Sequence, residues 1–66
     1  MAHNPTWHAH NNLAGYEQCT FGRKVGHILR RHNGEWCALY DGVFLAAVPD
    51  PEQAKVIVQA AAEAAR

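Results

Sequence analysis

The sequence predicts an α+β fold, in which an antiparallel meander of three to four strands packs on one C-terminal helix and follows an irregular N-terminal arm. Two hairpin signals, Asn33-Gly34 and Asp41-Gly42, separate short runs rich in aromatic and β-branched residues. Residues 51–66 then repeat apolar side chains at helical spacing. Because 66 residues support one small core, we expect an arm at residues 1–14 and a single ββ(β)α domain at residues 15–66.

The arm is expected because its fourteen residues, MAHNPTWHAHNNLA, show neither the period of a strand nor that of a helix. They include no Lys, Arg, Asp or Glu. Trp7 is the largest apolar side chain among them, and leaving an indole in water forfeits a large stabilisation. We therefore expect Trp7 to dock on the domain.

The strands are expected in four runs, namely YEQCTF, KVGHILRRH, EWCALY and VFLAAV. Both Gly-containing pairs between the last three runs favour two-residue type I′ turns, which need positive φ at both central positions. Alternation along a strand assigns three side chains to the side that faces the helix: Trp36, Ala38 and Tyr40. The opposite face then receives a second apolar group: Leu29, Cys37, Leu39 and Phe44.

The helix is expected from about Pro51 to the C-terminus. Asp50 suits the N-cap, Pro51 suits the first helical position, and Gln53 has the spacing of a capping box. The stripe that faces the sheet is expected to contain the apolar positions Ala54, Ile57, Val58, Ala61 and Ala65. A helix of this kind covers one face of the sheet and leaves the other face to the arm, to a second copy or to a partner.

Composition and charge narrow the function classes. Six basic and six acidic residues cancel, which removes the net positive charge of a general nucleic-acid binder. No run approaches the roughly 18 apolar residues of a membrane span, and the first residues do not resemble a signal peptide. We therefore expect a soluble, cytoplasmic protein without membrane contact.

The expected core is thin. Of the 32 hydrophobic residues, 12 are Ala and two are Cys, so 18 large apolar side chains remain. A chain this short gains limited stability from such a core. We expect it to associate with a partner, most simply as a homodimer, because one self-complementary patch serves both copies.

Three segments carry a resemblance to a known family: Gly34-Glu35-Trp36-Cys37-Ala38, Val43-Phe44-Leu45 and Asp50-Pro51-Glu52-Gln53-Ala54. Residues 26–62, a little over half the chain, resemble the three-strand-plus-helix DNA-binding domains of plant ethylene-response factors and the arm-type domains of phage integrases. The resemblance implies a DNA-facing sheet surface, which here holds Leu29, Leu39, Asp41 and Phe44, with Arg31 and Asn33 as its polar members. Such a surface suits a protein better than a polyanion. The chain also resembles, in general style, short uncharacterised proteins encoded by prophages.

Basic residues concentrate in one run, at Arg23, Lys24, Arg30 and Arg31, with no acid among them. Such a run can contact phosphates or an acidic protein surface. It is also typical of a solvated edge strand, where cations discourage edge-to-edge pairing. We keep both interpretations.

Metal-binding and catalytic sites receive little support. His8, His10, Cys19 and Cys37 could together supply four zinc ligands, but no Cys-x-x-Cys or His-x3-His spacing is present. No elbow, acid partner or phosphate loop accompanies either Cys as a nucleophile. We expect no enzyme activity, no cofactor and no metal, with a small zinc-binding domain as a distant alternative.

The resulting hypothesis is a small non-catalytic protein-binding module. Phage and prophage accessory proteins of the anti-defence type, which inhibit or modulate a larger host complex, have this character. The alternative is a DNA-binding module of the integrase-arm type, so that nucleic acid is a possible partner. The residues expected to bind the partner are Arg23, Lys24, Leu29, Arg30, Arg31, Leu39 and Phe44.

Overall fold

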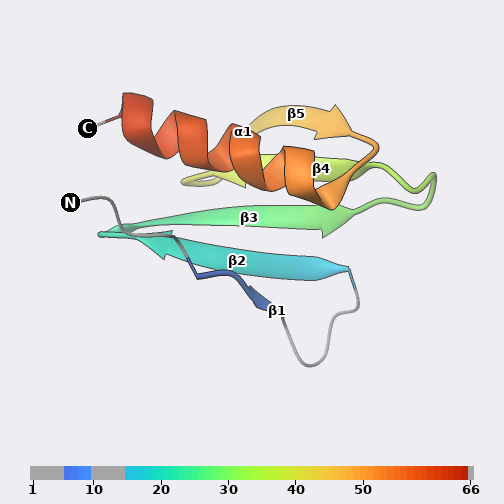
Figure 1. Cartoon of the computed structure of the whole chain (residues 1–66), viewed down its shortest axis with the longest axis horizontal. Helices are drawn as coiled ribbons and strands as arrows, with labels where there is room; N and C mark the ends of the chain where they lie inside the picture. The colour runs from blue at the N-terminus through green and yellow to red at the C-terminus, as the bar shows by residue number, and fades with distance from the viewer. Residues whose placement is uncertain (1–5, 10–14, 66) are drawn as a thin grey trace.

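The computed structural model describes residues 6–9 and 15–65. Within them, one antiparallel sheet lies against one helix, α1 (Pro51–Ala64) (Figure 1). The described part of the sheet contains five strands: β1 (His8–Ala9), β2 (Tyr16–Phe21), β3 (Lys24–Arg30), β4 (Trp36–Tyr40) and β5 (Val43–Val48). Spatial order follows chain order from β1 to β5. The predicted α+β meander with a C-terminal helix is confirmed.

Strand β1 is an addition to the expected three or four strands. His8 pairs with Gln18 and Ala9 pairs with Glu17, so part of the segment predicted to be irregular joins the sheet. Two residues are too short to produce an alternation in the sequence. The backbone groups that pair with β1 lie on the edge of β2 that faces away from β3, where donors and acceptors would otherwise have no partner in the sheet.

The two hairpin turns differ in type. Asp41 and Gly42 both have positive φ, 53° and 80°, as the predicted type I′ turn requires. Between β3 and β4, Gly34 alone is in the left-handed region, and the Arg31 amide donates to the Glu35 carbonyl at 2.7 Å. A three-residue loop therefore replaces the two-residue turn predicted for Asn33-Gly34. The Asn33 side chain stabilises this loop by accepting from the Glu35 amide at 3.0 Å.

The helix begins where the sequence predicts. Asp50 is the N-cap, with its carboxylate accepting a hydrogen bond from the Glu52 amide at 3.1 Å. The buried positions of α1 are Ala54, Val58 and Ala62. These positions recur every four residues and end at Ala62. The predicted stripe extended to Ala65, which is exposed.

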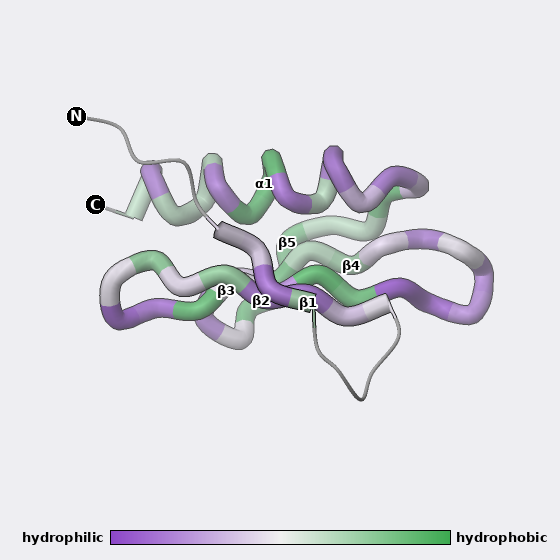
Figure 2. The backbone as a smooth tube through the Cα atoms, turned by 60° about the horizontal axis from the view of Figure 1, so that its bottom comes forward, coloured by the Kyte–Doolittle hydropathy of each residue, from purple (hydrophilic) through white to green (hydrophobic). Residues whose placement is uncertain are grey.

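The core lies between this helix stripe and the centre of the sheet. Ile28, Ala38, Ala54 and Val58 have no exposed surface. Half-buried side chains pack around them, among them Trp36, Tyr40, Leu45 and Ile57. The predicted helix-facing side of β4 is therefore confirmed. Figure 2 shows the complementary pattern, with hydrophilic stretches at the connections between strands.

Gly26 lets the helix approach the sheet closely. A Cβ atom at this position of β3 would lie 2.3 Å from Cγ1 of Val58 and 3.0 Å from the Phe21 ring. The first distance is shorter than real contacts of a Cβ atom allow, and the second is tighter than most of them. The missing side chain is thus what lets Val58 reach full burial.

Helix α1 has 14 residues, and the described part of the chain contains no helix long and apolar enough to cross a membrane.

Candidate functional site

The face of the sheet opposite α1 is the candidate functional site, and we name it the open face. Strand register assigns its members, because paired residues project to the same side. Its apolar band lies mostly on β3, β4 and β5: Val25, Leu29, Cys37, Leu39, Phe44 and Ala47. Its polar half lies mostly on β2 and β3: Tyr16, Gln18, Thr20 and His27.

The apolar band is continuous across three strands. Leu29 pairs with Cys37, and Leu39 pairs with Phe44. Leu29 is 37% exposed and Phe44 is 57% exposed, while Leu39 and Cys37 are half-buried. The structure therefore brings together Leu29, Leu39 and Phe44, the three apolar residues predicted to bind a partner.

The polar half contains a small hydrogen-bonded group. The Tyr16 hydroxyl contacts Nδ1 of His27 and lies 3.5 Å from Oε1 of Gln18. The Tyr16 and His27 rings are 5.5 Å apart, centre to centre. Sequence reasoning missed this group, although period-2 alternation from Tyr16 to Thr20 could have indicated it. It offers a hydroxyl, an imidazole and an amide to a bound surface.

Charged side chains lie at the ends of the strands, and no Lys, Arg, Asp or Glu belongs to either part of the open face as defined above. Arg23 and Lys24 are at one end of β3. Arg30 and Arg31 are at the other end, roughly 20 Å away at about 3.3 Å per residue. The predicted basic run is thus divided into two pairs. Since β3 is the central strand, its interpretation as an edge strand is wrong.

One member of these pairs is already engaged. Lys24 Nζ lies 3.0 Å from the Asp41 carboxylate, and both side chains are about half exposed. The hydrogen bond and the charge of Asp41 raise the pKa of Lys24. An exposed pair of this kind contributes little stability, but it neutralises one of the four cations.

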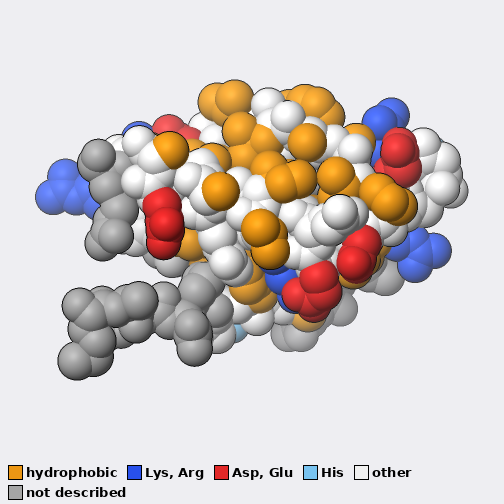
Figure 3. Space-filling view, turned by 45° about the horizontal axis from the view of Figure 1, so that its top comes forward, with side chains coloured by type: hydrophobic (Ala, Val, Ile, Leu, Met, Phe, Trp, Pro, Cys, Tyr) orange, Lys and Arg blue, Asp and Glu red, His pale blue; other side chains and the backbone are white. Residues whose placement is uncertain are grey.

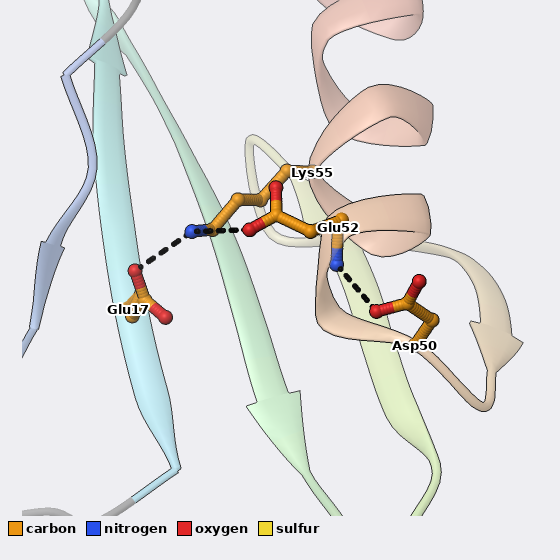
Figure 4. A network of polar contacts seen from close by, with 4 residues as sticks. All are labelled: Glu17, Asp50, Glu52 and Lys55. Carbon is orange, nitrogen blue, oxygen red and sulfur yellow. Dashed lines mark hydrogen bonds and ion pairs between the residues drawn. The ribbon is translucent and has the colours of Figure 1, made fainter.

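Trp7 docks on the helix side of the sheet, so the expectation that this ring docks is confirmed. Its ring meets Phe21 edge to face, with centroids 6.4 Å apart, and Lys55 Nζ lies 5.8 Å from the Trp7 ring centre. Lys55 also binds Glu17 at 3.2 Å and Glu52 at 3.8 Å, which ties α1 to β2 (Figure 4). Trp7 therefore extends the core and does not cover the open face.

The two cysteines lie on opposite faces of the sheet. Cys19 pairs with Gly26 on the helix side, whereas Cys37 pairs with Leu29 on the open face. The two sulfurs therefore cannot share one zinc ion. Among the described residues, no three His, Cys, Asp or Glu side chains gather in a metal-binding group. His10, the fourth proposed ligand, lies outside the described residues.

We predict that the two thiols differ in reactivity. Cys19 is 1% exposed, and burial raises its pKa, so less thiolate forms at neutral pH. Iodoacetamide should alkylate Cys19 about tenfold or more slowly than Cys37 in the folded chain. Mass spectrometry of the single-cysteine variants Cys19→Ala and Cys37→Ala checks this. Equal rates in the native state, with equal rates in denaturant, would contradict the placement of Cys19.

A shallow hollow lies at the start of α1. It is lined by Asp50, Glu52, Gln53, Val56 and Ile57. Its carboxylates already have structural partners, since Asp50 caps the helix and Glu52 is near Lys55. We therefore assign the hollow no separate function.

Comparison with known proteins adds no relative: no protein-family model, no curated protein and no solved structure matches this chain. The resemblance to ethylene-response-factor and integrase arm-type domains stays a prediction.

Proposed function

We propose that this chain is a non-catalytic protein-binding module whose open face binds another protein. The observation that carries the proposal is the continuous apolar band, centred on Leu39 and Phe44, none of whose members is charged. Protein interfaces have an apolar centre depleted of charge and a polar rim. The cations lie at the two ends of β3, outside the apolar band; Lys24 pairs with Phe21 and Arg30 pairs with Trp36, so these two side chains project to the helix side.

The role we propose is that of a cytoplasmic accessory protein of a phage or prophage that inhibits or modulates a larger host complex. A single domain of 66 residues acts more readily by covering a surface of another protein than by catalysing a reaction. The open face supplies a centre of aromatic and aliphatic side chains next to hydroxyl, imidazole and amide groups. Such mixed surfaces bind proteins with defined orientation.

A second copy is the simplest occupant of the open face, and we propose a homodimer in the absence of a host partner. Two apolar bands without charge do not repel each other, and a two-fold axis lets one patch serve both chains. The four longer strands, about 4.8 Å apart and about 20 Å long, give a face of roughly 380 Å² before side-chain relief is counted. This is about half of the roughly 800 Å² per partner of a standard interface.

The test is sedimentation equilibrium at micromolar concentration. We expect a mass near twice the 7.3 kDa of one chain. Leu39→Glu should weaken the dimer about 30-fold or more, because it buries a carboxylate at the centre of the interface. The matched control Val56→Glu adds the same charge on the outer side of α1, where Val56 is 62% exposed, and should leave the dimer intact.

A parent chain that stays monomeric under these conditions contradicts the homodimer. The proposal that the open face binds another protein is then tested by a second experiment. In it, the parent chain and the Leu39→Glu chain are compared for retention of a host complex. Equal retention by both chains contradicts the open face as the binding surface.

The alternative is a DNA-binding module of the integrase-arm type. Its support is the sheet-and-helix topology together with Arg23, Arg30 and Arg31. Fluorescence anisotropy with an arbitrary duplex separates the two proposals, because each neutralised phosphate contributes about −0.9 to the slope of log K against log salt. Absence of binding at low salt removes the alternative.

A further inference from the structure

We propose a second binding site, at the free edge of β5, that takes an extended apolar segment of a partner protein as an added strand. This site is separate from the open face, and its occupant is an uncharged stretch of polypeptide in β conformation. The argument rests on the exposed backbone of β5, on the side of α1 next to it, and on the bulge within β5.

Strand β5 forms an unprotected edge. Among the described residues it pairs only with β4, and its six residues, VFLAAV, contain no charge and no Pro. Charges, Pro and short length are the usual devices that protect sheet edges from pairing. The opposite edge is formed by the two-residue strand β1. β5 therefore offers free backbone donors and acceptors where β1 offers few.

The side of α1 next to β5 has the same apolar character. Lys55 reaches Glu17 on β2, so the flank on the other side of the helix faces β5, which α1 also contacts. At 100° per residue this flank contains Ile57, Ala61 and Ala64. Figure 3 shows apolar side chains gathered across this side of the molecule, with charged groups at its ends and along its lower margin.

Small side chains leave room beside the edge. Ala61 and Ala64 project little from the helix, so a strand added to β5 could place alternate side chains against this flank. Its other side chains would extend the open face next to Phe44. Backbone hydrogen bonds supply affinity in this mode of recognition, and pockets for alternate side chains supply specificity.

The bulge in β5 favours a foreign segment over a second copy. Ala38 pairs with Ala46 while Leu39 pairs with Phe44, so Leu45 is an extra residue in β5. In a two-fold pair of β5 strands the irregularity would occur twice, once in each strand, and both would have to be accommodated in one ladder. A regular segment from another protein meets one bulge only and can pair with the regular stretch Ala46–Val48.

The test uses a chemically prepared chain and a displayed library of random octapeptides as the probe. Ligation at the Trp36–Cys37 bond gives access to N-methylated residues in β5. Amide directions alternate along a strand, so one of Ala46 and Ala47 donates toward β4 and the other toward the free edge. A chain N-methylated at Ala46 alone and a chain N-methylated at Ala47 alone are therefore matched controls for each other.

We expect the library to yield extended apolar peptides. N-methylation at the outward amide should weaken their binding about tenfold or more, since it removes one hydrogen bond and blocks the edge, while thermal stability stays that of the parent. N-methylation at the inward amide should lower thermal stability instead.

Four results would overturn the proposal. The first is a library that yields no binding peptide, and the second is peptide binding that neither N-methylation affects. The third is binding that Leu39→Glu abolishes, because those peptides then occupy the open face. In the fourth, N-methylation at the outward amide converts a dimer to a monomer, which makes a second copy the occupant of the edge. Failure of the homodimer test leaves this site unaffected, so the two proposals fail separately.

Discussion

Replacing Gly26 with Ala is expected to destabilise the domain by about 3 kcal/mol. The new methyl group would lie 2.3 Å from Cγ1 of Val58, so either the helix or the sheet must move. A chain of this size has a free energy of unfolding of roughly 3 to 10 kcal/mol. Thermal and urea denaturation followed by circular dichroism should therefore show a large loss or no folded state.

A second substitution shows whether this contact is the cause. Val58→Ala alone should cost about 2 kcal/mol, because it leaves a cavity in the core. Combined with Gly26→Ala it removes the clashing methyl group, so the double variant should be more stable than the sum of the single effects by about 1 kcal/mol or more. Val56→Ala is the matched control on the outer side of the helix. Additive effects for both pairs would place Gly26 away from Val58.

Ile28→Ala should cost about 3 to 4 kcal/mol, whereas Leu29→Ala should cost about 1 kcal/mol or less. The two residues are neighbours in β3 and project to opposite faces. Ile28 has no exposed surface, and Leu29 is 37% exposed on the open face. Urea denaturation at low micromolar concentration measures the free energy of unfolding of each variant. Equal losses would mean that the open face is as closely packed as the core.

A homodimer changes what this comparison reports. If two open faces meet, Leu29→Ala should lower stability further as protein concentration rises, since association stabilises the folded state. The loss for Ile28→Ala should be largely independent of concentration. A concentration series therefore separates the contribution of the core from that of the interface.

The sequence predicted the features of the fold that depend on local patterns. Alternation in β4 assigned Trp36 and Ala38 to the core side, and the Asp50-Pro51 pair located the start of the helix. Asp41-Gly42 formed the expected turn because both residues accept positive φ. Asn33-Gly34 did not, since the Asn33 side chain binds the Glu35 amide and stabilises a longer loop.

What the sequence could not supply depends on contacts between distant segments. His8 and Ala9 join the sheet because β2 offers free backbone groups, and two residues carry no pattern of their own. The importance of Gly26 follows from the path of α1 above it. Grouping of Leu29, Leu39 and Phe44 was predictable from alternation, but the separation of Arg23 from Arg31 required the length and central place of β3.

The consecutive order of the strands has a kinetic consequence. Each strand pairs with its neighbour in the chain, so the hairpins can form without closing long loops, and we expect folding in the fast range for a sheet protein. The sheet is covered later in chain growth, because Ala54 and Val58, which pack with Ile28 in the core, belong to α1, the element that follows all five strands. Until α1 has been synthesised, both faces of the hairpins expose apolar side chains, and a nascent chain at this stage is most exposed to aggregation and to capture by chaperones.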